Sequence, residues 1–333
     1  MKAVVYGRYG SPDVLELKEV EKPVPADDEV LIKVEACALN AFDWHLLRGK
    51  PFVARLSGGL FKPRNAILGE DVAGRVESAG RKAGRFKPGD EVFGDLSSCG
   101  SGGFAEYACA RESVLAPKPA KLTFEQAAAV PMAAGTALQG LRDKGRIGPG
   151  KTVLINGASG GVGTFAIQIA KALGAEVAAV CGPGSQDLAR SLGADRVLDY
   201  TRTDFTKEGR RYDLILAANG NLRPADYRRA LNPGGICVVA GGSNAQVFSS
   251  LFLGPWMSLG RRTKITVLVA KVNSKDLEFI TGLLESGTIE PVIDRRYSLS
   301  ETAEAMRYLE AGHAKGKIIV TPGEDHSRSS KTG

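Results

Sequence analysis

A glycine-rich turn between an apolar strand and a helix is the feature that most constrains what this chain can fold into. Val153-Leu154-Ile155 form a strand of the buried type, and residues 156–163 follow with the sequence NGASGGVG. Glycines permit a tight turn and a close approach of the backbone to a pyrophosphate, which the free N–H groups and the positive dipole end of the next helix bind. Ala158 stands at the first position of the G-x-G-x-x-G pattern, so the motif is a variant. The turn predicts dinucleotide binding by Ala158, Ser159, Gly160, Gly161 and Val162. The alternative is a glycine-rich turn that serves only close packing.

Strands and helices alternate along the chain from residue 152 onward. Apolar strands are predicted at residues 153–155, 175–180, 213–216 and 236–240, with a helix over 164–173. Nearly continuous apolar strands joined by helices are typical of a parallel sheet with both faces covered. Residues 1–120 differ, because their short alternating strands and Gly/Pro turns indicate a compact β-rich domain. Between these regions, Thr123 can cap a helix, with Gln126 at the capping-box spacing, and an Ala-rich run extends to Leu141.

Composition argues against several classes of protein. The net charge is +7, from 44 Lys and Arg against 37 Asp and Glu, but the basic residues are dispersed, so nucleic acid is not an expected partner. No apolar run is long enough to span a bilayer, and the first residues are typical of a strand rather than of a signal peptide, which favours the cytoplasm. The five cysteines form no CxxC pair, so neither a disulfide framework nor a structural zinc site is predicted.

The residues after the second apolar strand bear on the choice of nucleotide. An NAD site usually carries an acidic residue at the end of that strand, where it binds the ribose hydroxyls. Here the strand is followed by Gly182-Pro183-Gly184-Ser185, and no acid occurs before Asp187. This pattern favours NADPH, because no carboxylate repels its 2′-phosphate. The predicted contacts are Gly182, Ser185 and Tyr200, with positive charge from Arg190, Arg202 or Lys317.

Several further motifs occur in a fixed order along the chain. They are ALNAFD (38–43), LGEDVAG (68–74), FKPGDEVFG (86–94), GFAEY (103–107), AAAVP (127–131), LGAD (192–195), GG (234–235) and GKI (316–318). Together they resemble the zinc-free quinone oxidoreductase (zeta-crystallin-like) branch of the medium-chain dehydrogenase/reductase superfamily, and the resemblance covers the chain to about residue 322. It implies an α/β protein with a GroES-like β-rich catalytic domain, residues 1–124 and 271–333 with a polar tail, and a Rossmann doubly wound parallel-sheet domain, residues 125–270.

The resemblance also implies an active site without a metal. In zinc alcohol dehydrogenases of this superfamily, a Cys, a His and a Cys or Asp hold the metal, whereas those positions here are Asn40, Glu70 and Met132. The lobe that holds a structural zinc in those enzymes is replaced by the short segment 95–100. Because one potential oxygen ligand remains, no metal is expected. Zinc-free members of this kind reduce substrates that conjugation already activates, namely quinones, enals and enones, with NADPH as the hydride source.

Three residues are the catalytic candidates that the resemblance implies. Asn40 would orient the substrate or the nicotinamide, and the alternative is an asparagine that caps a turn. Asp43 would hold the same loop through hydrogen bonds, which is equally an ordinary structural role. Thr136 matches a family position near the cofactor, and the alternative is a hydroxyl bonded to its own helix. Gly241 and Lys317 complete the predicted cofactor-binding set.

The sequence also leads us to expect a particular reaction and a particular assembly. The favoured function is zinc-independent, NADPH-dependent reduction of quinones or of the C=C bond of α,β-unsaturated carbonyls. The alternatives are an NAD(P)-dependent carbonyl or alcohol oxidoreductase, a reductive domain of a biosynthetic pathway, and a nucleotide-binding accessory protein with little turnover. The apolar segment 262–270 is predicted to be an edge strand of the Rossmann sheet. An uncovered edge strand invites pairing with its symmetry mate, so a homodimer is expected.

Overall fold

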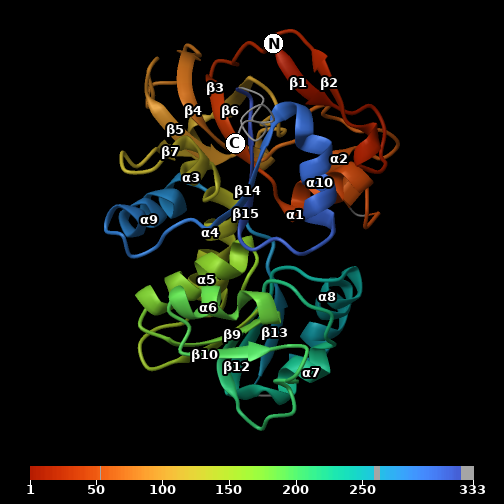
Figure 1. Cartoon of the computed structure of the whole chain (residues 1–333), viewed down its shortest axis with the longest axis vertical. Coiled ribbons are helices and arrows are strands. Elements are labelled where there is room, and N and C mark those ends of the chain that lie inside the picture. Colours follow the sequence, from red (N-terminus) through yellow and green to blue (C-terminus); the bar gives the residue numbers. More distant parts are fainter. Residues whose placement is uncertain (53, 259–262, 324–333) are drawn as a thin grey trace, which may run out of the picture. The chain divides into compact units, whose positions relative to one another are not determined.

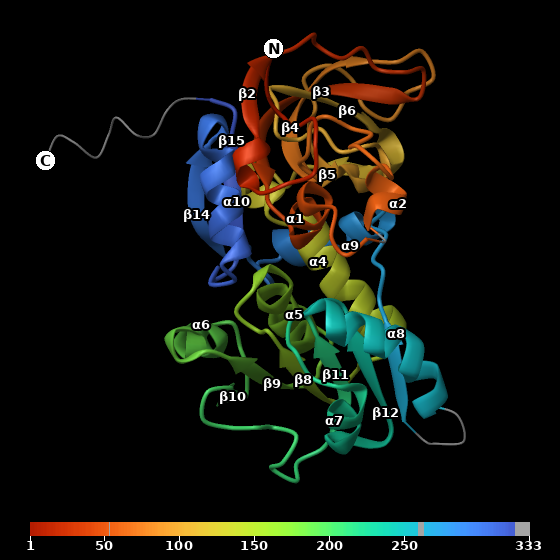
Figure 2. The same ribbon diagram turned by 90° about the vertical axis from the view of Figure 1, so that its right-hand side faces the viewer.

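The computed structural model describes residues 1–52, 54–258 and 263–323, which form two compact units (Figures 1 and 2). The first unit comprises Met1–Met132, Val272–Glu285 and the chain from Pro291, and the second comprises Ala133–Lys271 and Ser286–Glu290. The first boundary thus lies after residue 132, whereas the sequence estimate placed it after 124. The difference arises because α3 (Phe124–Ala128) packs on the sheet of the first unit. The predicted polar tail beyond residue 323 lies outside the described residues.

The second unit is built on a six-stranded parallel sheet. Its strand order is β10-β9-β8-β11-β12-β13, which is the 3-2-1-4-5-6 order of a Rossmann fold when the strands are numbered along the chain. This order confirms the predicted doubly wound parallel sheet. The strands are β8 (Thr152–Asn156), β9 (Glu176–Cys181), β10 (Arg196–Asp199), β11 (Tyr212–Ala217), β12 (Leu231–Val239) and β13 (Lys264–Val267).

Helices connect and cover these strands. As Figure 1 shows, α5 and α6 lie beside β9 and β10, and α7 and α8 lie beside β12 and β13. The core of this unit contains Leu154, Ile215 and Val239, which are fully buried because parallel strands have both faces covered. The helices are α5 (Gly161–Ala172), α6 (Gln186–Ser191), α7 (Pro224–Arg229) and α8 (Asn244–Ser258).

The first unit contains a seven-stranded sheet to which both ends of the chain contribute. Its order is β14-β15-β3-β4-β5-β7, and β6 also pairs with β3. A separate hairpin joins β1 (Lys2–Val5) to β2 (Glu16–Glu19). The strands of the large sheet are β3 (Glu29–Ala38), β4 (Asp71–Ala79), β5 (Glu91–Asp95), β6 (Tyr107–Arg111), β7 (Leu115–Pro117), β14 (Ile293–Ser298) and β15 (Lys317–Thr321).

The Ala-rich run does not form one continuous helix. Thr123 and Gln126 form the predicted capping box, but α3 ends at Ala128 and a new helix, α4 (Pro131–Leu138), begins at the proline. Proline lacks an N–H group and clashes with the preceding turn, so it starts a helix more readily than it continues one. A π-helical turn (Gln139–Lys144) follows α4.

The remaining helices of the first unit are short or amphipathic, and α1 packs against α10. None of the helices in the described ranges is long and apolar enough to cross a membrane. The α-helices are α1 (Ala41–Arg48), α2 (Ala54–Gly58), α9 (Ser274–Glu285) and α10 (Thr302–Glu310), and the 3-10 turns are Pro12–Val14, Leu96–Ser98, Glu112–Val114 and Leu299–Glu301.

Candidate active site

The glycine-rich turn joins β8 to α5, and its backbone leaves no room for side chains at two of the glycines. Gly157 adopts a left-handed φ of +85°, which L side chains rarely adopt. A Cβ atom at Gly163 would lie 2.2 Å from the Gly157 carbonyl oxygen, so no side chain fits there. The turn is also tied to β9, because the N–H groups of Gly157 and Ala158 both donate to the Val180 carbonyl oxygen, at 3.2 and 3.0 Å. These contacts hold the N-terminal turn of α5 at the carboxyl end of β8.

The predicted pyrophosphate-binding residues lie together at this helix terminus. Gly160 is the N-cap of α5, and Gly161 and Val162 form its first turn with Ser159 immediately before the cap. Ala158 is fully buried, so it contributes through the backbone of the turn. The first residues of α5 are partly exposed, and their N–H groups precede the internal hydrogen bonds of the helix. The residues present therefore fit a dinucleotide pyrophosphate.

The three residues predicted at the nucleotide ribose also lie near one another. A Cβ atom at Gly182 would be 3.4 Å from both Cε1 and the hydroxyl oxygen of Tyr200, so the Tyr200 ring stands beside Gly182. Ser185 lies in the 3-10 turn Pro183–Ser185 that directly follows Gly182. Asp199, at the end of β10, accepts hydrogen bonds from the hydroxyl and the N–H group of Thr201, at 2.7 and 2.9 Å. These bonds hold the pKa of Asp199 below its ordinary value.

The Lys317 ammonium is buried in the first unit, where it donates to Asn40 and Asp71. Its role as a cofactor contact stays a prediction. Of the other two cations considered, Arg190 pairs with Asp187 at 2.8 Å, and Arg202 lies on the exposed segment just after Tyr200.

A buried hydrogen-bonded chain fixes the ends of the central strands. Asn156 Nδ2 donates to the Tyr227 hydroxyl at 3.2 Å, and that hydroxyl donates to Gln246 Oε1 at 2.8 Å. Gln246 Nε2 donates to the carbonyl oxygen of Gly241 at 2.8 Å. Gly241, a predicted cofactor residue, is therefore held in place at the carboxyl end of β12. The sequence did not indicate this chain, because Tyr227 and Gln246 lie on two separate helices.

Three polar side chains meet where β15 pairs with β3. The antiparallel register pairs Ile319 with Ala38, and its continuation by two residues places Lys317 opposite Asn40. The Lys317 ammonium donates to Asn40 Oδ1 at 2.5 Å and to Asp71 Oδ2 at 3.1 Å. An ammonium group has no acceptor, so the Asn40 atom that faces it is the carbonyl oxygen. The Asn40 NH₂ group is therefore directed away from Lys317.

Both carboxylate oxygens of Asp43 are bound by backbone amides. Oδ2 accepts from the N–H of Asn40 at 2.8 Å, and Oδ1 accepts from the N–H of Gly69 at 2.9 Å. Asp43 thus ties the start of α1 to the segment before β4, and Asn40 is the N-cap residue of that helix. Burial raises the pKa of Asp43 to about 7, against the opposing effect of these two N–H donors.

Glu70 and Met132 occupy the two other positions that hold zinc in the zinc alcohol dehydrogenases. Glu70 Oε1 accepts from the Ser101 hydroxyl at 2.7 Å, and Oε2 is buried without a partner among the described residues. The Met132 backbone N–H donates to Asp71 Oδ1 at 2.9 Å. Burial raises the pKa of Asp71, although the Lys317 ammonium opposes this effect. In the part of the chain that the structure describes, no three His, Cys, Asp or Glu side chains are grouped as metal ligands.

Thr136, the third catalytic candidate, lies on α4 and belongs to the second unit. Its side chain is buried, and no described residue forms a hydrogen bond with its hydroxyl. The helix-bonded alternative for Thr136 is therefore not seen among these residues.

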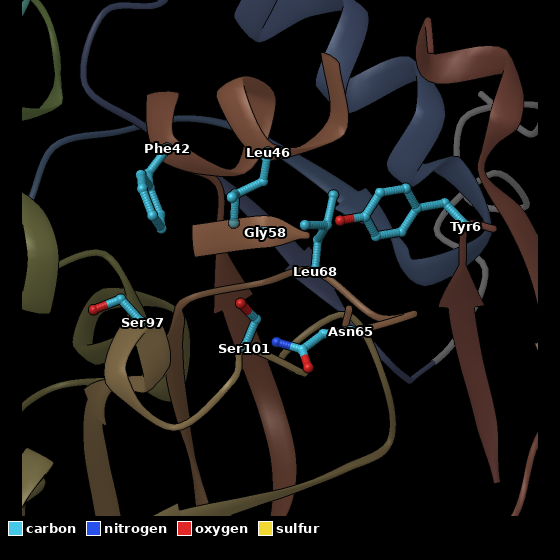
Figure 3. A pocket seen from close by; sticks show the side chains of 8 residues that line it. All are labelled: Tyr6, Phe42, Leu46, Gly58, Asn65, Leu68, Ser97 and Ser101. Atoms are coloured by element: carbon cyan, nitrogen blue, oxygen red, sulfur yellow. The ribbon is translucent and has the colours of Figure 1, made fainter. Parts of the chain in front are cut away.

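A cavity of about 50 Å³ lies beside α1 in the first unit (Figure 3). Figure 3 shows the hydroxyl groups of Tyr6 and Ser101 and the amide of Asn65 around it, with apolar side chains from α1 above them. Polar and apolar groups both line this small cavity. The lining residues are Tyr6, Phe42, Leu46, Gly58, Asn65, Leu68, Ser97 and Ser101. Sequence reasoning missed Tyr6 and Ser101; the only local signal is the Gly100-Ser101-Gly102 segment.

Comparison with known proteins decides the family. Residues 26–120 match the alcohol dehydrogenase GroES-like domain, and residues 192–320 match the family described as zinc-binding dehydrogenase. The chloroplastic quinone-oxidoreductase QR1 of Triphysaria versicolor is 35% identical over 97% of this chain and 98% of its own. The chain belongs to the quinone oxidoreductase branch of the medium-chain dehydrogenase/reductase superfamily. The predicted family and the GroES-like and Rossmann architecture are thereby confirmed.

Two further comparisons concern chemistry and fold. The chloroplastic NADPH-dependent alkenal/one oxidoreductase of Arabidopsis thaliana is 35% identical over 97% of this chain and 80% of its own. The solved structure of the quinone oxidoreductase from Coxiella burnetii superposes with a TM-score of 0.85 at 29% identity, and the match covers 97% of this chain and 99% of that one. This member of the quinone oxidoreductase family is therefore an oxidoreductase.

Proposed function

We propose that this quinone oxidoreductase family member is a zinc-independent, NADPH-dependent enzyme that reduces quinones or the C=C bond of α,β-unsaturated carbonyls. The observation that carries the proposal is the buried contact of the Lys317 ammonium with Asn40 Oδ1 and Asp71 Oδ2. Asn40 is at one of the three positions that hold zinc in the zinc alcohol dehydrogenases, and here its Oδ1 accepts from an ammonium group. A divalent ion would also need neutral nitrogen or thiolate ligands, which Asn40, Glu70 and Met132 do not provide.

NADPH is the cofactor that the nucleotide-binding residues favour. The turn 158–162 would hold the pyrophosphate, and Gly182, Ser185 and Tyr200 would face the 2′-phosphate of the ribose. The Asp199 carboxylate is engaged by neighbouring donors, because Oδ1 accepts from Thr201 and Oδ2 accepts from Gln186 Nε2 at 3.3 Å. Bound NADPH supplies the hydride. The name of the Arabidopsis relative, an NADPH-dependent alkenal/one oxidoreductase, supports the same cofactor and substrate class.

The catalytic candidates have different proposed tasks. Lys317 fixes the Asn40 amide so that its NH₂ group can donate to a substrate oxygen or to the nicotinamide amide. Asp43 holds the backbone at Asn40 and Gly69 and so positions that amide. The unbonded hydroxyl of Thr136 is proposed to contact the nicotinamide end of the cofactor. Because no metal polarises the substrate, conjugation must activate it.

The test is a screen of NADPH oxidation against quinones, enals, enones and simple ketones. Reduction with 4-deuterated NADPH should place deuterium on the β-carbon of an enone. Deuterium on a carbinol carbon would instead establish the carbonyl or alcohol oxidoreductase, the alternative that the alcohol dehydrogenase description of the N-terminal match favours. NADPH binding without turnover of any of these substrates would favour the accessory protein.

Assembly and location belong to the same proposal. β13 is the terminal strand of the six-stranded sheet, and pairing with a second copy would continue the sheet as a homodimer. Part of the predicted edge segment, Arg262, lies outside the described residues. Light scattering should give twice the mass of the chain, and a monomer mass at micromolar concentration would contradict the dimer. A cytoplasmic location is supported by five unpaired thiols, which suit a reducing compartment.

A further inference from the structure

We propose that Glu70 and Ser101 form the proton-donating pair of this enzyme, and that the Tyr6 hydroxyl holds the substrate oxygen in the cavity beside them. The inference rests on the proposed function and deepens it. Hydride addition to a conjugated carbonyl leaves an enolate, and reduction is complete only when a proton reaches that enolate. The residues predicted from the sequence include no evident proton donor.

Glu70 carries a buried carboxyl oxygen with no partner. The residue is fully buried, and only its Oε1 has a hydrogen bond, to the Ser101 hydroxyl at 2.7 Å. Oε2 has no partner in the described ranges. An ionised Glu70 carboxylate would lack the hydrogen-bond donors that a buried charge requires. A protonated carboxyl group needs fewer of them. The environment therefore favours Glu70 as a neutral acid.

The groups around Glu70 also favour its protonated form. Burial is the largest cause that raises the pKa of Glu70, and neighbouring carboxyl groups raise it further, while only the Ser101 hydroxyl lowers it appreciably. The one buried cation of the site, Lys317, is engaged by Asn40 and Asp71. The titratable groups that face this region are Asp43 on α1, Asp71 on β4, Asp95 on β5, Cys37 on β3, Tyr6 after β1 and Lys317 on β15.

Ser101, which contacts Glu70, has a backbone conformation that is uncommon for a residue other than glycine. It has a φ of +64° and lies between Gly100 and Gly102, whose φ values are +98° and +122°. A non-glycine residue in this region is strained, and such strain persists where surrounding contacts fix the residue. Here the contact is with Glu70, and the same hydroxyl borders the cavity (Figure 3). Ser101 therefore connects the buried acid to this cavity.

Tyr6 supplies the second polar group of the cavity. Its side chain is 4% exposed, and its hydroxyl has no hydrogen-bond partner among the described residues. Figure 3 shows this hydroxyl directed toward Leu68 at the cavity. This hydroxyl borders the cavity, where it can donate a hydrogen bond to a ligand oxygen.

A hydride transfer and a proton transfer together complete the reduction. The hydride from NADPH forms a C–H bond at the β-carbon, and the π electrons move onto the carbonyl oxygen, which accepts from the Tyr6 hydroxyl. When Glu70 is protonated on Oε1, its carboxyl O–H donates to Ser101 Oγ across their 2.7 Å contact, and the Ser101 O–H can face the cavity. The Ser101 O–H bond then breaks as a C–H bond forms at the α-carbon, while the Glu70 proton passes to Ser101 Oγ. Glu70 is left as a carboxylate and takes a proton from water after the product leaves.

The experiment uses Glu70→Gln and Ser101→Gly in the full-length enzyme, with an α-substituted enone in D₂O and unlabelled NADPH. Glutamine matches the shape of a neutral glutamic acid, and glycine suits the positive φ of residue 101. We expect each variant to lower kcat by about 10²-fold, the range of general acid catalysis. We also expect racemic deuteration at the α-carbon, where the wild type gives one stereoisomer. Ser98→Gly is the matched control, because Ser98 is an exposed residue of the same loop.

A second readout does not depend on turnover. At neutral pH, the infrared spectrum of the protein should contain a band from a protonated carboxyl group that Glu70→Gln removes and Ser98→Gly leaves. Unchanged kcat and unchanged stereochemistry in both variants, with enone turnover intact, would overturn the pair alone. A wild type that reduces no enone or quinone would overturn the proposed function and the pair with it.

Discussion

Replacement of Lys317 by methionine tests whether its buried ammonium organises the site. The side chains of Lys317 and Asp71 are 3% and 0% exposed, and Nζ lies 3.1 Å from Asp71 Oδ2. Removal of one partner leaves a buried carboxyl group without its counter-charge, which costs about 3–5 kcal/mol. We therefore expect Lys317→Met to lower the free energy of unfolding by about that amount. Asn40 loses the donor that fixes its amide, so kcat/KM should also fall about tenfold, which corresponds to about 1.4 kcal/mol.

Lys171→Met is the matched control for this prediction. Lys171 also pairs with an aspartate, Asp195, at 2.8 Å, but the two side chains are 37% and 39% exposed. Solvent screens such a pair, and its contribution to stability is about 0–1 kcal/mol. Urea unfolding followed by circular dichroism measures the stability of both variants, and NADPH oxidation measures kcat/KM on the same samples.

The double variant Lys317→Met/Asp71→Asn separates the two causes. It removes the uncompensated carboxyl group, so stability should recover by roughly 1–3 kcal/mol relative to Lys317→Met, the range of coupling between contacting residues. Activity should not recover, because Asn40 still lacks its donor. Equal destabilisation by Lys317→Met and Lys171→Met, or an undiminished kcat/KM in Lys317→Met, would refute the reasoning.

Four further predictions follow from the two units. Gly182→Asp should shift preference from NADPH toward NADH, because it adds a carboxylate beside Tyr200; fluorescence titration with both nucleotides measures the change, and an unaltered preference would contradict it. Asn40→Ala should lower kcat/KM roughly tenfold or more, as steady-state kinetics can establish. The purified protein should contain substoichiometric zinc by elemental analysis and keep its activity after chelation; stoichiometric zinc lost together with activity would refute zinc independence. Burial raises the pKa of Asp95 to about 6, so the folded state keeps a proton that the unfolded state releases, and stability falls as pH rises from about 4 to 6. Asp95→Asn should flatten that decline in urea unfolding, and an identical slope would contradict the assignment.

The Rossmann part of the fold was predictable because its signals are local. The turn 157–163 contains its own conformational requirements, and apolar strands of the second unit are consecutive in the sequence with one crossover each. The break in the Ala-rich run is also marked locally, by Pro131, which begins α4. Proline lacks an N–H group, so it starts a helix more readily than it continues one.

The candidate site was only partly predictable, because its contacts join distant parts of the chain. Asn40 and Lys317 are 277 residues apart, and they meet only through the antiparallel register of β15 and β3. From the sequence, Lys317 was a cation near the chain end that a 2′-phosphate could attract. The contact of Glu70 with Ser101 likewise depends on a loop conformation with positive φ. Such pairings need the strand register and the loop geometry, which no periodic pattern specifies.

The balance of charge in the first unit bears on the kind of reaction that its site can support. Among the described residues, Asp43, Glu70, Asp71 and Asp95 are buried there near the Lys317 ammonium, so four ionised carboxylates against this ammonium would leave a local charge of −3. An enolate adds negative charge as it forms, and a site that is already negative would repel it. The raised pKa values of Glu70, Asp43 and Asp95 relieve this conflict, because protonated acids carry no charge and can donate hydrogen bonds. A buried acidic cluster without a metal is thus compatible with reduction when its acids hold protons, and the acid that contacts the cavity through Ser101 is the one placed to deliver its proton.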